Sequence, residues 1–314
     1  ITLPRTRGLD TFHALEAAHR GEIDCACIVG GNLYSATPNT EWAKTALDRI
    51  ACKVYLTTTL NQGHLYGVDN SDALILPVKS RDEEQQSTTQ ESMFNFVRLS
   101  NGGIDRLDNV RSEVSILATI GQQLLAKIAP NNPIDFSQFE QHDTIRETIA
   151  NTVTGMEELK DIGVAKKEFH VRHRVMHKPS FNTATAKARF IVHPIPQVNS
   201  RSERYPFLLA SVRSEGQFNS IIYEETDSYR FNAGRHTVFL SDEDMQDLGV
   251  SHGDAVDVVS QQGVMKQARV QRFDLPKGNV MAYYPEANVL AEHNLDPRSL
   301  TPNFKSIAVN IIVR

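Results

Sequence analysis

Apolar side chains in the first 130 residues recur with two alternating periods. Residues 11–19, 40–50 and 110–128 show the spacing of amphipathic helices, with Thr40 as the expected N-cap of the second. Three runs typical of strands lie among these helices, at residues 23–29, 53–59 and 72–77. The first and the last of them are apolar enough to predict buried strands. Strands that alternate with helices predict a parallel sheet covered by helices, so we expect an α/β domain here.

The last third of the chain has a different pattern. Short strand-like runs separated by turn residues recur at even spacing, at residues 189–193, 207–212, 237–240, 255–260, 264–272, 280–284 and 306–313. Such spacing predicts an all-β barrel or sandwich. Residues 241–248 are expected to form a short helix, with Ser241 as its N-cap and Gly249 as its stop.

The part between these two regions is expected to be a connector. Residues 136–163 are polar and helical in pattern, and residues 166–178 are rich in lysine, arginine and histidine. The basic stretch is either a solvated face or a patch that meets phosphates or another part of a larger protein. We therefore divide the chain into domains at residues 1–130, 131–180 and 181–314.

Composition and charge narrow the class of protein. The 314 residues suit about two domains, and the formal net charge of −5 argues against a nucleic-acid binder. The longest apolar runs are too short to span a membrane. The three cysteines, all in segments expected to be buried, are too few for a disulfide framework and favour the cytoplasm. The chain begins at Ile1, which favours a chain cut from something longer.

Polar loops follow two of the predicted parallel strands. Gly30, Gly31 and Asn32 follow the first, where glycines let a backbone approach phosphate, although a plain tight turn has the same pattern. Thr58 and Asn61 follow the second, where hydroxyl and amide groups suit a base or a ribose. The alternative is that the threonines are there for their β-propensity. Both loops are expected at the carboxyl edge of the sheet, where α/β proteins bind ligands.

A third polar loop follows the predicted strand at residues 207–212. Arg213 could bind phosphate and Gln217 and Asn219 could bind polar ring edges, with Gly216 between them; an ordinary surface loop is the alternative. We find no nucleophile motif, no metal-ligand spacing and no acid–base pair of carboxylates. The sequence therefore predicts a cofactor-holding body, with no catalytic residue and no metal ligand assigned.

Five stretches occur in series: CIVGGNLYSATPNTEWAKTAL, VYLTTTLNQGHLYGVDNSDALILP, FNTATAKARF, YPFLLASVRSEGQFNS and NLDPRSLTPNFKSIAVNI. In this order they resemble the C-terminal half of the molybdopterin oxidoreductases that use a bis-molybdopterin guanine dinucleotide. The resemblance is strongest to the formate-dehydrogenase-like branch with its acid-resistance-associated oxidoreductases. It implies a Rossmann-like dinucleotide-binding domain over residues 1–130 and a double-psi β-barrel domain over residues 181–314.

The resemblance also implies roles for particular residues. Gly30, Gly31 and Asn32 match the family's dinucleotide loop, and Thr58 and Asn61 match the loop after the second strand. Many relatives carry an acidic residue for the guanine in that second loop, and Thr58 cannot accept hydrogen bonds as a carboxylate does. The barrel residues that match positions near the cofactor are Arg213, Gly216, Gln217, Asn219, Asn288 and Lys305.

Family members are more than twice as long as this chain, which implies an absent N-terminal half as its partner. That half would carry the molybdenum or tungsten ligand, the catalytic residues and any iron–sulfur cluster, and would meet a small-molecule substrate and an electron-transfer partner. The fragment alone is then expected to be inactive. A binding or assembly module that keeps the fold without the metal cofactor is the alternative. An NAD-dependent dehydrogenase is disfavoured because the glycine fingerprint is absent.

Overall fold

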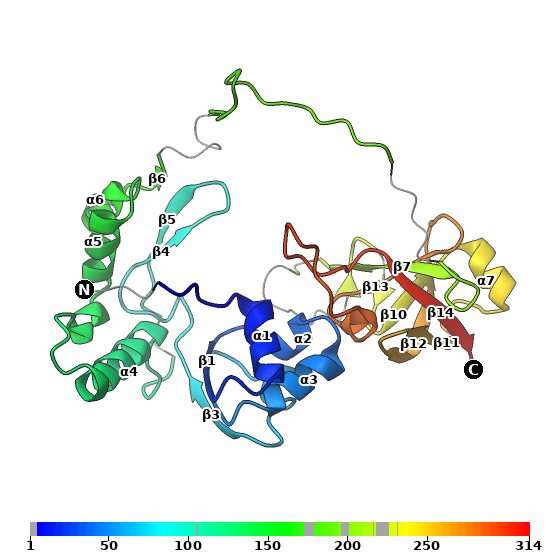
Figure 1. Cartoon of the computed structure of the whole chain (residues 1–314), viewed down its shortest axis with the longest axis horizontal. Coiled ribbons are helices and arrows are strands. Elements are labelled where there is room, and N and C mark those ends of the chain that lie inside the picture. The colour runs from blue at the N-terminus through cyan, green and yellow to red at the C-terminus, as the bar shows by residue number, and fades with distance from the viewer. Residues whose placement is uncertain are drawn as a thin grey trace. The chain divides into compact units, whose positions relative to one another are not determined.

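The structure is a computed structural model, and it describes residues 5–104, 106–172, 179–195, 201–215, 217, 226–230 and 232–314. Contacts divide the chain into two compact units (Figure 1). The first unit comprises Ile1–Tyr55, Leu60–Ile75 and Ile195–Arg314, and the second comprises Leu56–Thr59 and Leu76–Pro194. None of the helices in the described part of the chain is long and apolar enough to cross a membrane.

The first unit begins with a small α/β arrangement. Its elements are α1 (Thr11–His19), β1 (Cys25–Val29), α2 (Leu33–Ala36), α3 (Thr40–Asp48), β2 (Cys52–Thr57), the 3-10 turn η1 (Gln62–His64) and β3 (Asp72–Pro77). The strands form one sheet in the order β1-β2-β3. The backbone amide of Asp72 donates to the Ala51 carbonyl and that of Val78 to the Thr57 carbonyl, a constant offset that makes β2 and β3 parallel.

The predicted helices of this part are confirmed, with one correction at a helix start. Asn39, not Thr40, is the N-cap of α3, because its side-chain oxygen accepts from the amide of Trp42 at 3.2 Å. Asn39 lies in the left-handed region, with φ +54°, a conformation that asparagine tolerates better than threonine. Thr40 is the first residue of the helix instead.

The predicted burial of the first and third strands is wrong. The core here lies between α1, α3 and one face of the sheet, where Leu15, Ala46 and Leu47 pack together. Alternate residues of β1 point away from that core, and Val29 is 46% exposed while Leu74 in β3 is 53% exposed. The predicted burial of the cysteines is wrong as well, because Cys25 and Cys27 are exposed and Cys52 is half-buried.

Lys53 in β2 is a fully buried cation. Its Nζ donates to the carbonyls of Leu47 and Ile50, at 2.8 and 3.0 Å, and also to the hydroxyl of Ser71. Leu47 lies in the last turn of α3 and Ile50 just beyond that helix, where the helix dipole is negative. Burial lowers the pKa of Lys53. The ammonium group thus satisfies the buried end of a helix.

We expect Lys53→Met to lower the free energy of unfolding by about 1–3 kcal/mol, because it removes the hydrogen bonds of a buried charged donor to the Leu47 and Ile50 carbonyls while keeping the length of the side chain. Urea unfolding of both proteins measures the difference. Lys277→Met is the control, since Lys277 pairs with Asp247 at the surface and is 54% exposed. Equal effects of the two substitutions would show that the buried ammonium does not stabilise α3.

The second unit combines a small sheet with short helices. Its elements are β4 (Thr88–Glu91), β5 (Phe96–Ser100), α4 (Glu113–Ile128), η2 (Phe136–Glu140), α5 (His142–Thr152), η3 (Glu157–Leu159), α6 (Ile162–Ala165) and β6 (Phe169–His170). The sheet order is β4-β5-β6. Its core gathers Val97, Leu159, Ile162 and Phe169.

Two sequence predictions change in this unit. The long helix is confirmed as α4, but its apolar face is not buried, since Leu117, Ile120 and Leu124 are 40–52% exposed. The polar helical region is broken into the short elements from η2 to α6 rather than one helix. Of the basic stretch, residues 173–178 lie outside the described residues, and Phe169 and His170 form β6.

The C-terminal part of the first unit is a closed β-barrel, as the sequence predicted. Its strands are β7 (Phe207–Val212), β10 (Thr237–Leu240), β11 (Ala255–Ser260), β12 (Val264–Arg272), β13 (Asn279–Tyr283) and β14 (Ile307–Val313), in the order β10-β12-β11-β14-β7-β13. Neighbours pair both parallel and antiparallel. Alternate residues of β7 and β11 fill the interior of the barrel, where Leu209 and Val258 are completely buried.

Two details of the barrel follow from local sequence. α7 (Asp242–Leu248) has Ser241 as its N-cap and ends at Gly249 with φ +67°, both as predicted. The strand predicted at residues 189–193 is wrong: this stretch is exposed and has no regular structure. A closed barrel has no free edge with which a seventh strand could pair, so an apolar run alone does not make one.

Candidate functional site

The loop after β1 is built around two glycines and an asparagine. Gly30 and Gly31 have φ values of +64° and +73°, the left-handed region that favours glycine. A Cβ at either position would meet no atom within 4 Å, so the backbone of this loop faces open space. Asn32 is buried and caps α2, accepting from the amide of Ser35 at 3.1 Å.

Asn61 joins this loop to the one after β2. Its Nδ2 donates to the carbonyl of Gly31 at 3.0 Å, and its Oδ1 accepts from the amide of Gly63 at 2.9 Å. The amide of Asn61 in turn donates to Nδ1 of His64 at 2.9 Å, so this nitrogen carries no proton, and burial lowers the pKa of His64 in keeping with that. Four of the predicted dinucleotide residues are therefore gathered at one place: Gly30, Gly31, Asn32 and Asn61. Thr58 is an exposed bend residue directly after β2.

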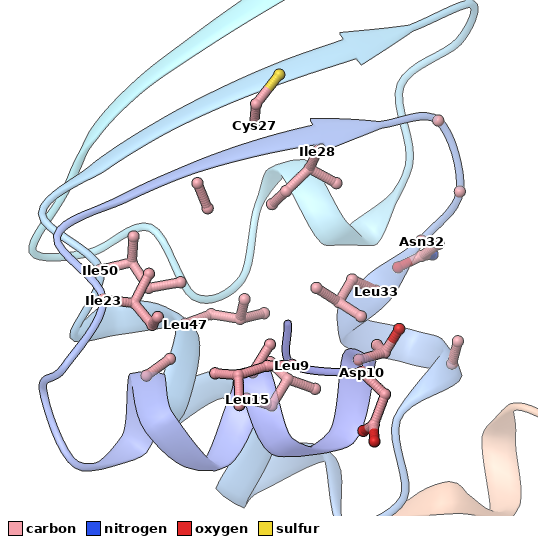
Figure 2. Close-up of a pocket in the computed structure, with 17 residues that line it drawn as sticks. Leu9, Asp10, Leu15, Ile23, Cys27, Ile28, Asn32, Leu33, Leu47 and Ile50 are labelled. Atoms are coloured by element: carbon pink, nitrogen blue, oxygen red, sulfur yellow. The ribbon is translucent and has the colours of Figure 1, made fainter. Parts of the chain in front are cut away.

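A pocket of about 490 Å³ opens beside the glycine loop. Figure 2 shows that Leu15, Ile28, Leu33 and Leu47 line it from α1, β1, α2 and α3, so its wall is mainly aliphatic. Polar groups at its edge include Asp10, which caps α1, and Asn32. Phosphate needs donors rather than an aliphatic wall, so only the glycine loop at the rim suits a diphosphate.

The loop after β7 is described in part. Gly216 and Asn219 lie outside the described residues. Gln217 is 5% exposed, and its backbone amide donates to the carbonyl of Ser214 at 3.2 Å. Arg213 is exposed, with its guanidinium over the ring of Tyr284 at 5.7 Å from the centroid. A buried amide and an exposed cation thus stand next to each other at the end of one barrel strand.

Three cations gather beside this loop. Arg230 donates to the carbonyl of Arg213 at 3.1 Å, and Nζ of Lys305 donates to the carbonyl of Ser211. Burial lowers the pKa of Lys305, and the charges of Arg213 and Arg230 lower it further. Arg230 has a carboxylate partner in Asp227, at 2.7 Å. Among the described residues, neither Arg213 nor Lys305 forms an ion pair. The cluster therefore suits an anionic group such as a phosphate.

Asn288 links the barrel to the α/β part of the same unit. It is fully buried, and its Nδ2 donates to the carbonyl of Ser35 at 2.8 Å while its own carbonyl accepts from the amide of Asn39 at 2.8 Å. Its side-chain Oδ1 is buried without a hydrogen-bond partner among the described residues. An unpaired buried acceptor costs stability, so this atom marks a place where a donor from a ligand would be favourable.

The structure adds an ion pair that sequence analysis missed. Nε of Arg235 lies 2.7 Å from Oε1 of Glu286, and both side chains are largely buried. Arg235 also donates to the hydroxyl of Ser214 and to the carbonyl of Tyr284, each at 2.5 Å. With Tyr34 and Gln62 among others, the pair lines a pocket of about 480 Å³. Arg235 and Glu286 are 51 residues apart, and no local motif connects them.

Asp227 is a buried carboxylate whose pKa matters for stability in acid. Burial raises its pKa, but hydrogen bonds from Arg230 and from the Tyr283 hydroxyl outweigh burial and hold the pKa below the ordinary value of 3.8. Its contribution to stability is therefore complete above the unfolded-state pKa and is lost as the pH falls through the lower pKa of the folded state.

We accordingly expect the urea midpoint of the protein to fall between about pH 5 and pH 2, with part of the fall due to Asp227. Asp227→Asn removes the ionisable group and should make the midpoint less dependent on pH over the same range. Denaturation curves at several pH values test this. The same pH dependence in both proteins would contradict the assignment.

Side chains that commonly bind metal ions do not cluster in the described part of the chain. Within it, no group of three or more histidine, cysteine, aspartate or glutamate side chains could hold a metal ion. The amides, hydroxyls, backbone groups and cations described above are groups that bind an organic anion through hydrogen bonds and charge.

Comparison with known proteins finds related sequences. Residues 207–308 match the model of the Molydopterin dinucleotide binding domain. An uncharacterized oxidoreductase of Mycobacterium tuberculosis is 35% identical over 99% of this chain. These matches support a molybdopterin oxidoreductase C-terminal region. The resemblance of the five sequence stretches to molybdopterin oxidoreductases is confirmed, whereas the formate-dehydrogenase-like branch stays a prediction. The matched domain takes its name from binding a molybdopterin dinucleotide.

One further relative and one solved structure extend the comparison. Protein YdeP of Escherichia coli K12 is 26% identical over 99% of this chain. Acetylene hydratase from Pelobacter acetylenicus shares the fold, with a TM-score of 0.65 and 13% identity over 97% of this chain and 46% of its own. The chain spans 42% of the length of both the mycobacterial and the Escherichia coli relative.

Proposed function

We propose that the chain is the cofactor-binding C-terminal portion of a molybdenum or tungsten oxidoreductase that resembles formate dehydrogenase alpha subunits. In this proposal β1 to β3 and their helices are a Rossmann-like unit for one guanine dinucleotide, and the barrel is a double-psi barrel that covers both pterin cofactors. The match of residues 207–308 to a dinucleotide binding domain supports the proposal.

The observation that carries the proposal is the unpaired Oδ1 of Asn288. This acceptor is buried where the barrel meets α2 and α3, while the other polar groups of Asn288 are paired. Pterin rings carry N–H donors at their edges, and an amide oxygen is a matching acceptor. The residue therefore fits the proposed ligand and lacks a partner without it.

The charged and flexible groups of the site fit the rest of a dinucleotide. Arg213 and Lys305 supply positive charge for a diphosphate, and Gly30 and Gly31 leave open space for a close backbone approach. Gln217 and Asn61 offer amides for polar edges, with Gly216 and Asn219 assigned from the sequence. When bound, the cofactor supplies two-electron redox chemistry at a metal held by pterin dithiolenes. The residues of this chain bind and orient it.

The partners follow from the same proposal. The remainder of a protein of the relatives' length would provide the metal ligand, the catalytic residues, any iron–sulfur cluster and the sites for a small-molecule substrate and an electron-transfer partner. Exposed apolar side chains on α4, such as Leu117, Ile120 and Leu124, favour such a covering partner. The low cysteine content favours a cytoplasmic protein.

Metal and nucleotide analysis of the full-length protein tests the proposal. Purified from a host that makes the cofactor, it should contain about one molybdenum or tungsten and two guanine nucleotides per chain. A folded protein with neither would contradict the proposal and support a binding or assembly module. Thr58 favours that second function, because an exposed hydroxyl replaces the carboxylate that many relatives use for the guanine.

A further inference from the structure

All three cysteines of the chain lie on one face of the small sheet. Cys25 and Cys27 alternate along β1 with Ala26, which packs against the core of α1 and α3. Cys52 alternates along β2 with Lys53, whose ammonium caps α3. Because side chains alternate between the faces of a strand, the three thiols lie opposite the helices. Figure 2 shows the Cys27 side chain directed away from α1.

Cys25 and Cys52 are direct neighbours across two strands. The amide of Cys52 donates to the carbonyl of Asp24 at 3.0 Å, which in a parallel pair places Cys52 beside Cys25. The Cys52 thiol also contacts the Cys25 thiol through a hydrogen bond, which is the main reason that the pKa of Cys25 is raised. By the same register, the neighbour of Cys27 on β2 is Val54. Cys27 therefore has no cysteine directly beside it on β2, unlike Cys25.

We propose that Cys25 and Cys52 form a reversible intramolecular disulfide that links β1 to β2. Neighbouring residues on paired strands bring Cα atoms within the range that a disulfide requires. Cys25 is exposed and Cys52 half-buried, so a small oxidant reaches the pair. The oxidant is a low-molecular-weight disulfide such as glutathione disulfide. This site is independent of the cofactor, since neither thiol belongs to the loops assigned to the dinucleotide.

The reaction is a thiol–disulfide exchange in two steps. One thiolate of the pair attacks glutathione disulfide, which forms a mixed disulfide and releases one glutathione. The second cysteine then attacks the protein sulfur of that mixed disulfide and releases a second glutathione. The protein loses two electrons and two protons, and glutathione disulfide is reduced to two glutathione molecules. Dithiothreitol reverses the reaction.

The test is peptide mapping of the full-length protein after incubation with glutathione disulfide. Trypsin should release residues 21–44 linked to residues 50–53, a product about 2 Da lighter than the two peptides together. Dithiothreitol should separate them again. The linked peptide should be absent from Cys25→Ser and Cys52→Ser, which should instead accumulate the glutathione adduct on the remaining cysteine of the pair.

Cys27→Ser is the matched control, because Cys27 lies on the same strand and face but beside Val54. It should form the linked peptide at the wild-type rate within about two-fold. Loss of the link in Cys27→Ser with retention in Cys25→Ser would overturn the assignment of the pair. Glutathione adducts without any link, in the wild-type protein, would overturn the disulfide itself. Circular dichroism of each variant confirms that serine leaves the fold intact.

Discussion

Replacing Arg235 with methionine is expected to lower the free energy of unfolding by about 3–5 kcal/mol, because it leaves the Glu286 carboxylate buried without its partner. The side chains of Arg235 and Glu286 are only 9% and 16% exposed, so water replaces little of the lost interaction. Ser214 and the carbonyl of Tyr284 lose their donor in the same step. Urea unfolding followed by circular dichroism measures the effect.

Arg272→Met is the matched control for this prediction. Arg272 pairs with Asp242 on the same barrel, but the two side chains are 68% and 63% exposed, so its removal should cost about 1 kcal/mol or less. The double variant Arg235→Met with Glu286→Met should recover much of the stability, since no buried charge is then left unpaired. If Arg235→Met costs no more than Arg272→Met, the buried pair does not stabilise the barrel.

Elements with strong local signals could be predicted from the sequence. The barrel strands alternate buried and half-buried residues, as in β7 and β11, and α7 has both its N-cap at Ser241 and its stop at Gly249. α1 needed only its apolar spacing and the glycine that follows. In each case the determining residues lie within one element, so the pattern and the structure agree.

Properties that depend on distant neighbours could not be predicted. The runs of β1 and β3 are apolar enough for burial, but burial depends on what packs against each face, and Val29 and Leu74 are exposed. β4 is the polar run Thr88–Glu91, which becomes a strand because β5 pairs with it rather than because of its own composition. Tertiary pairing overrides strand propensity here.

In the candidate site, too, some contacts could be predicted from the sequence and others could not. The contact of Asn61 with Gly31 follows from the rule that parallel strands end at one edge of a sheet, so the sequence alone predicted that these loops meet. The pair of Arg235 and Glu286 could not be found, because only the barrel closure brings together residues so distant along the chain. Which atoms of Asn288 are paired also depends on how Ser35 and Asn39 are placed.

Arg213→Ala is expected to weaken retention of the proposed cofactor by about 10-fold to 100-fold in the full-length protein, the effect of losing one charged donor to a phosphate. The guanidinium is exposed and lies over the Tyr284 ring, so its removal should change the free energy of unfolding little. Metal and guanine nucleotide content after extensive dialysis measures retention.

Arg204→Ala separates recognition from loss of surface charge. Arg204 is also an exposed barrel arginine over a tyrosine ring, 5.3 Å from the Tyr205 centroid, but it is outside the cluster of Arg213, Arg230 and Lys305. It should keep wild-type cofactor content. Equal losses in both variants would mean that net charge, not the position of Arg213, governs retention. A loss confined to Arg213→Ala requires a specific anion contact, since the two variants remove the same charge and the same kind of ring contact.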